Sequence, residues 1–308
     1  MRDFVYIVHE VDSPLMKTVS SILLLSALFL FGCQHPTEVQ VKQDTQPDPV
    51  QVTPVPVDTL TAYQNPIDST AITPGDQQKY FAFMLVTATQ FDAGGIVASS
   101  TVSNVRFLDT SRAFRFGGKT LGYWGINIGP LLTSPLTING HSMLQIPHRI
   151  REGIASAFFG WEYYWLEGGK GGIDSVYTWS AQTDSIGTIS VSISAPGPLT
   201  VLAPKGGGAY ARDENLSLRW EGPAGVLIYL SSVNQLTGDT RPLMMFKPLG
   251  TSGKAVINSN VLKLLPLERH YVLSFVLANR RIIPGLTNFH ADVLAQAAFV
   301  YNTYIEIR

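Results

Sequence analysis

Residues 215–232 read NLSLRWEGPAGVLIYLSS, and this stretch decides the fold expected of the C-terminal part of the chain. Its first half alternates the apolar Leu216, Leu218 and Trp220 with polar residues, which is the period of a strand with one buried face. The GPAG sequence at 222–225 is a turn signal, because glycine and proline interrupt a strand. The apolar run VLIYLSS then predicts a second strand after the turn.

The same alternation continues toward the end of the chain. HYVLSFVL, which begins at His270, and the last ten residues each place apolar side chains at every second position. Short strands at this spacing, separated by turn signals, are typical of a β-sandwich. The residues expected to share a buried face in these two strands are Tyr271, Leu273, Phe275, Leu277, Phe299, Tyr301, Thr303, Ile305 and Ile307.

NLSLRWEGPAGVLIYLSS resembles the Trp-bearing second strand, turn and third strand of fibronectin type III and related immunoglobulin-like domains. LPLERHYVLSFVLAN is similar to their sixth strand, and this resemblance gives Tyr271 the role of the tyrosine corner. TVLAPKGGGAYAR, residues 200–212, is similar to the first strands of immunoglobulin-like modules in bacterial envelope lipoproteins. The resemblance covers residues 199–308 and implies a sandwich without the paired cysteines of true immunoglobulin domains.

The sequence before residue 199 also predicts strands. YFAFMLVT, which begins at Tyr80, and the alternation around Val191 each indicate a half-buried strand. The APGP cluster at 195–198 marks the expected boundary between a β domain of unknown family, 79–195, and the immunoglobulin-like domain, 196–308. A helix is expected only between Pro147 and Phe159. The predicted fold class is therefore all-β, with two β-sandwich-like domains after a signal peptide and a disordered linker.

The net charge and the number of cysteines limit the functions that the chain can have. The chain has 22 basic and 23 acidic residues, a formal net charge of -1, and so lacks the basic field that binds nucleic acid. A single cysteine excludes a disulfide within the chain. We therefore expect neither nucleic-acid binding nor a disulfide framework.

That cysteine, Cys33, follows the sequence MKTVSSILLLSALFLFG from Met16. A basic residue before a short apolar run is the layout of a secretory signal peptide, so residues 1–32 are expected to be a leader with its true start at Met16. The run is shorter than a membrane-spanning helix. An ordinary buried cysteine after a generic signal peptide is the alternative interpretation.

LFGC at the end of the leader resembles the bacterial lipobox, although Phe31 stands where that motif usually has a small or β-branched residue. The resemblance implies a palmitate-type lipid on Cys33 and attachment to the cell envelope. Gln34 after the cysteine, by similarity to lipoprotein sorting, implies the outer membrane rather than the inner one.

Residues 33–78 are rich in Pro, Gln and Thr, a composition that does not bury enough apolar surface to fold. We expect a stiff, disordered tether that holds the β body away from the membrane. An extra strand of the first domain is the alternative for the part after Tyr63.

Several short motifs resemble those of catalytic or ligand-binding sites. NGHSML, which contains Ser142, departs from the G-x-S-x-G nucleophile elbow at Leu144 and is interpreted as a turn. The glycine-rich stretches at 168–172 and 205–208 lack the setting of a phosphate loop and are also interpreted as turns. The histidines, which include His141, His148, His270 and His290, are not at metal-ligand spacings, so no metal site is predicted. No cofactor and no catalytic residue is predicted either.

The aromatic run FFGWEYYW, residues 158–165, is the one stretch with the character of a binding site. In a strand Trp161, Tyr163 and Trp165 share a face and, if exposed, can stack on sugar rings. The alternative is that these three rings are core residues, which puts Glu162 and Tyr164 outside.

Three functions follow from these patterns. The first is a lipid-anchored envelope protein, not an enzyme, that acts as a binding or structural module; its partners are the membrane, through Cys33, and envelope proteins or polysaccharide. The second is a glycan-binding module using Trp161, Tyr163 and Trp165. The third is a secreted hydrolase with a carboxylate pair such as Glu152 and Glu162, because glycosidases need two carboxyl groups.

Overall fold

The computed structural model of the protein describes residues 39–41, 47–55, 80–116, 119–125, 132–152, 155–168, 174–183, 187–233, 240–266, 270–284 and 292–308. These residues are nearly all in strands, with one short helix, α3 (Ser259–Leu262), so the predicted all-β class is confirmed. No helix that they form has the length and apolar character needed to span a membrane. The leader and Cys33 lie outside the described residues.

The strands follow one another through most of the described chain. In chain order they are β1 (Val39–Val41), β2 (Val50–Pro54), β3 (Tyr80–Asp92), β4 (Val97–Phe116), β5 (Lys119–Gly125), β6 (Thr137–Ile138), β7 (His141–Ser142), β8 (Leu144–Glu152), β9 (Ala155–Gly168), β10 (Val176–Thr183), β11 (Gly187–Ser194), β12 (Thr200–Ala203), β13 (Gly208–Tyr210), β14 (Leu216–Glu221), β15 (Leu227–Val233), β16 (Thr240–Pro248), β17 (Lys254–Ile257), β18 (His270–Ile283) and β19 (Asp292–Ile307).

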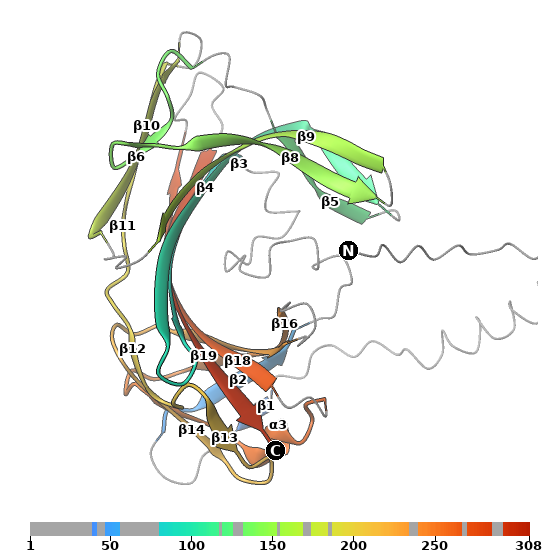
Figure 1. Cartoon of the computed structure of the whole chain (residues 1–308), viewed down its shortest axis with the longest axis vertical. Helices are drawn as coiled ribbons and strands as arrows, with labels where there is room; N and C mark the ends of the chain where they lie inside the picture. Colours follow the sequence, from blue (N-terminus) through green and yellow to red (C-terminus); the bar gives the residue numbers. More distant parts are fainter. Residues whose placement is uncertain are drawn as a thin grey trace, which may run out of the picture.

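A 12-stranded sheet runs through the whole body in the order β1-β2-β16-β15-β18-β19-β3-β4-β9-β8, with β13 on β19 and β5 on β4. Figure 1 shows that this sheet curves like a C. Its centre is a parallel pair, β19 with β3, which joins the two predicted ranges 79–195 and 196–308 in one sheet. The predicted boundary at 195–198 falls between β11 and β12, where the chain passes from one covering sheet to the other.

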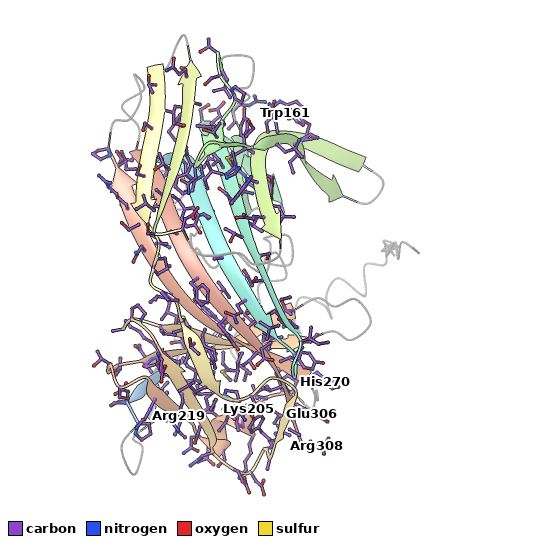
Figure 2. The ribbon with its side chains drawn as sticks, turned by 60° about the vertical axis from the view of Figure 1, so that its left-hand side comes forward. Trp161, Lys205, Arg219, His270, Glu306 and Arg308 are labelled. Atoms are coloured by element: carbon purple, nitrogen blue, oxygen red, sulfur yellow. The ribbon has the colours of Figure 1, made fainter. Side chains whose placement is uncertain are left out.

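Two smaller sheets cover the convex face of the large sheet, β11-β10-β6-β7 at one end and β12-β14-β17 at the other (Figures 1 and 2). Each encloses a hydrophobic core against the large sheet. Strand alternation explains this, because one face of each strand is apolar. In β14 the side chains of Leu216, Leu218 and Trp220 are buried and those between them exposed, as predicted. The GPAG turn then carries the chain into β15 of the large sheet.

Tyr271 lies at the start of β18 and is fully buried. Its hydroxyl donates a hydrogen bond to the backbone carbonyl of Pro266, five residues earlier, at 2.5 Å. A tyrosine corner makes this kind of bond to the backbone upstream of its own strand. The side chain therefore ties the backbone at Pro266 to the core.

The predicted tether is wrong for the residues around β2. Val50 and Val52 are buried in the C-terminal core, and β2 pairs with β16 inside the large sheet. Before β2, a carboxylate oxygen of Asp48 accepts a hydrogen bond from the backbone N–H of Ser252 at 2.9 Å. The alternation in VQVTP is short, but its residues pair in register with β16 and with β1, and these partners make it a strand.

The helix expected between Pro147 and Phe159 is also wrong. This stretch forms the antiparallel pair β8 and β9, in a register that runs from Leu144 opposite Tyr164 to Glu152 opposite Ala155. β8 is the last strand in the order of the large sheet, so Pro147 lies on an edge strand. An edge strand tolerates proline because one side of its backbone has no pairing partner.

Candidate functional site

The aromatic strand β9 does not present its three rings together to solvent. Tyr163 is 2% exposed and lies in the core, with its ring centroid 5.9 Å from that of Phe107 in an edge-to-face contact. Trp165 packs against the same core and stacks on His141, with ring centroids 5.5 Å apart. Trp161 is half-buried and meets Phe158 edge to face. The expectation of an exposed three-ring platform is therefore wrong for Tyr163.

Glu162 lies on the opposite face of β9, but it is not outside as the core interpretation predicted. It is 4% exposed and forms an ion pair with Arg106, which stands opposite it in β4. Burial of a carboxylate requires such a partner, because its charge is costly to remove from water unpaired. Tyr164, its neighbour, is half-buried, and the side chain of Glu152 lies outside the described residues.

Asn139 and Gly140, the first two residues of NGHSML, form the tight turn between β6 and β7, both at positive φ, so the interpretation as a turn is confirmed. His141 is exposed and His270 half-buried, whereas the side chains of His148 and His290 are not among those described. Within the described ranges no three His, Cys, Asp or Glu side chains gather as a metal site would require.

The buried hydroxyl of Tyr163 predicts a loss of stability at alkaline pH. Burial disfavours the phenolate and raises the pKa of Tyr163 from 10.0 to about 12. Between these values the unfolded chain loses the proton and the folded chain keeps it, so the free energy of unfolding falls as pH rises. We expect Tyr163→Phe to reduce the loss between pH 9 and pH 12 by about 1–2 kcal/mol, measured by urea denaturation. Equal losses in the variant and the parent would contradict this.

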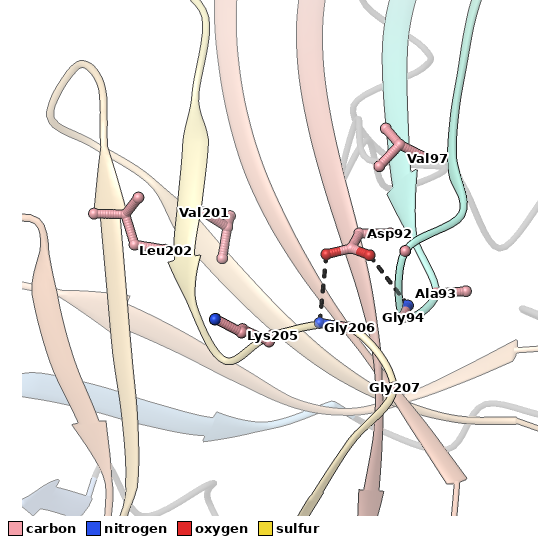
Figure 3. Close-up of a pocket in the computed structure, with 10 residues that line it drawn as sticks. Asp92, Ala93, Gly94, Val97, Val201, Leu202, Lys205, Gly206 and Gly207 are labelled. Carbon is pink, nitrogen blue, oxygen red and sulfur yellow. Dashed lines mark hydrogen bonds between the residues drawn. The ribbon is translucent and has the colours of Figure 1, made fainter.

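A hollow of about 930 Å³ lies between the β3–β4 hairpin and β12 (Figure 3). We call it the β12 hollow. One wall comes from the hairpin tip, including Asp92 and Val97, and the other from β12 and the loop after it, including Val201, Leu202 and Lys205. This volume is in the range of small-molecule sites, and the hollow is open to solvent rather than enclosed. The two walls are about a hundred residues apart in the chain, and the sheet topology brings them together.

The carboxylate of Asp92 joins the two walls at the base of the β12 hollow (Figure 3). One oxygen accepts a hydrogen bond from the backbone N–H of Gly94, at 3.2 Å, within the hairpin. The other accepts one from the N–H of Gly206 across the hollow, at 3.4 Å, and one from the hydroxyl of Tyr301, also at 3.4 Å. One side chain therefore bridges the two loops, through a bond to Gly206 that is long for an N–H···O hydrogen bond.

The glycines at this base allow the two backbones to touch. A Cβ atom on Gly207 would lie 3.0 Å from the Cα atom of Gly94, and both residues have φ near +72°. Residues 205–208 form a turn, as predicted. That this turn is also a wall of the hollow was not predicted from the sequence. The available signal was that two distant turns, at 94–95 and 206–208, each carry consecutive glycines.

Comparisons with known proteins do not assign the chain to a family. No family model and no curated protein matches the chain. Among solved structures it is similar to the yeast delta-COP-I mu-homology domain, with 8% identity and a TM-score of 0.24, over 74% of this chain and 97% of that chain. It is similar to the same domain complexed with the Dsl1 WxWxV peptide, with 6% identity and a TM-score of 0.22, over 74% of this chain and 98% of that chain. TM-scores this low do not establish a shared fold.

Proposed function

We propose that the chain is a lipid-anchored cell-envelope protein whose β body is a non-enzymatic binding module. The leader and the lipobox-like LFGC sequence support the anchor. The observation that carries the binding role is the β12 hollow, whose two walls are bridged by hydrogen bonds to Asp92. A preformed concave site loses little conformational entropy on binding, which is the general advantage of preorganisation.

Cys33→Ser tests the anchor. Serine has no thiol to accept the diacylglycerol, so we expect complete loss of labelling by a palmitate analogue and release of the protein from the membrane fraction. The measurement is labelling and fractionation of cells that express the full chain. Labelling that persists in Cys33→Ser would refute the assignment, and labelling lost without release would show a second attachment.

Leu202→Asp tests the binding role. The side chain of Leu202 lines the β12 hollow and is 41% exposed, so a carboxylate there changes the surface of the hollow at little cost to folding. We expect it to reduce binding of the immobilised chain to its envelope protein or polysaccharide partner at least tenfold. Leu264→Asp is the matched control, because Leu264 is 73% exposed and does not line the hollow. Equal binding by both variants would place the binding surface elsewhere.

The structure favours this proposal over the two alternatives drawn from the sequence. A sugar platform on β9 loses Tyr163 to the core, and the carboxylate of Glu162 is engaged in an ion pair with Arg106.

A further inference from the structure

The β12 hollow is bounded by the edge of a sheet. β12 is the first strand of the sheet β12-β14-β17 and pairs there with β14. A strand at an edge offers backbone donors and acceptors on its outer side, and an added strand can use them. The hollow lies along this side of β12, facing the β3–β4 hairpin (Figure 3).

The register of β14 shows which backbone groups of β12 face the hollow. Val201 stands opposite Trp220, and the N–H of Trp220 donates to the carbonyl of Gly253, on the β17 side, at 2.9 Å. In an antiparallel ladder the N–H and C=O of one residue point to the same side, so Val201 and Trp220 form a pair without mutual hydrogen bonds. The N–H and C=O of Val201 therefore point away from β14, into the hollow.

The side chains around this edge define what else an occupant must carry. Val97 on the facing wall is 60% exposed and Leu202 is 41% exposed, so both present apolar surface. Lys205 is exposed at the end of β12 and brings a positive charge. The carboxylate of Asp92 accepts three hydrogen bonds but keeps its negative charge, so the ammonium of Lys205 is the positive charge that the hollow offers to an occupant.

We propose that the β12 hollow binds a short extended peptide segment of a partner protein, which adds as a strand to the outer edge of β12. The peptide bonds to the N–H and C=O of Val201, places apolar side chains against Val97 and Leu202, and sets a carboxylate near Lys205. The register shift between Val201 and Ala203 ends the ladder, so the recognised segment is only a few residues long. This inference rests on the proposed binding role and names its partner class.

A random dodecapeptide library displayed on phage, selected on the purified full-length chain, is the probe. We expect enriched peptides to alternate apolar residues and to carry an acidic residue or an acidic C-terminus. A synthetic copy of an enriched peptide should then bind about tenfold more weakly to Lys205→Glu, because attraction becomes repulsion. Lys263→Glu is the control with the same charge change outside the hollow, and should bind as the parent does.

Val201→Pro tests the strand pairing itself. Proline lacks the N–H that points into the hollow, and an edge position whose N–H faces away from the sheet tolerates it. Binding should fall more than tenfold, while the thermal midpoint shows that the variant folds. The inference is overturned if no peptide is enriched, or if enriched peptides bind Lys205→Glu and Lys263→Glu equally.

Failure of the peptide inference and failure of the binding role are distinguishable. If no peptide is enriched but Leu202→Asp still abolishes binding of an envelope polysaccharide, the hollow is a binding site for another class of ligand and only the peptide inference fails. If Leu202→Asp and Leu264→Asp bind all partners equally, the proposed binding role of the hollow fails as well.

Discussion

Trp179→Ala is expected to lower the free energy of unfolding by about 3–5 kcal/mol, the range for removing a large buried aromatic side chain. Trp179 lies in the middle of β10 and is fully buried between the covering sheet and the large sheet. Its indole N–H donates to the hydroxyl of Ser103, at 2.9 Å, and that hydroxyl donates to the carbonyl of Leu85, also at 2.9 Å. The ring therefore joins two sheets by both packing and a buried hydrogen-bond chain.

Trp179→Phe separates these two contributions. Phenylalanine keeps most of the packing and loses the indole donor, while the hydroxyl of Ser103 keeps its bond to Leu85, so we expect a cost of about 1–2 kcal/mol. Trp161→Ala, at a half-buried ring outside the core, should cost about 1 kcal/mol. Urea denaturation followed by far-ultraviolet circular dichroism measures all three. A cost for Trp179→Ala no larger than for Trp161→Ala would show that the two sheets do not depend on this ring.

The features that were predictable from the sequence depend on nearby residues alone: the two-residue repeat of apolar side chains along a strand, and the residues of tight turns. The buried faces of β11 and β14 follow from alternation alone, because successive side chains of a strand point to opposite faces. The turns at 139–140 and 222–225 follow from glycine, asparagine and proline. Each of these signals is contained within about ten residues of sequence.

The pairing of distant strands was not predictable in this way. β3 and β19 form the parallel centre of the large sheet, although about two hundred residues separate them, and neither sequence encodes its neighbour. The same holds for β2, whose five residues pair with β16 on one side and with β1 on the other. Tertiary context overrides local propensity at such short strands.

The candidate site shows the same limit at the level of single side chains. Alternation correctly placed Glu162 and Tyr163 on opposite faces of β9. It could not show that Arg106 stands opposite Glu162 and allows its carboxylate to be buried. Asp92 carries no signal of its own, because its role arises only when the loop containing Gly206 reaches it. A carboxylate that joins two loops is visible only after the topology is known.

Gly253→Ala is expected to lower the free energy of unfolding by about 3 kcal/mol, although it adds a single methyl group. Gly253 precedes β17 and has φ of +68°, a conformation that costs an L-residue about 1–2 kcal/mol. A Cβ atom there would also clash with the carbonyl oxygen of Trp220, a backbone atom of β14. The carbonyl of Gly253 accepts the N–H of Trp220, so the loop cannot move away without breaking a ladder bond.

Gly225→Ala is the matched control for this clash. Gly225 has φ of +89°, in the same left-handed region, but a Cβ atom there meets nothing within 4 Å. It should therefore show only the conformational cost, about 1 kcal/mol, and the difference of about 2 kcal/mol between the two variants measures the contact with β14. Urea denaturation of both variants gives this difference. Equal costs would mean that β17 can be displaced from the carbonyl of Trp220 at little cost in free energy.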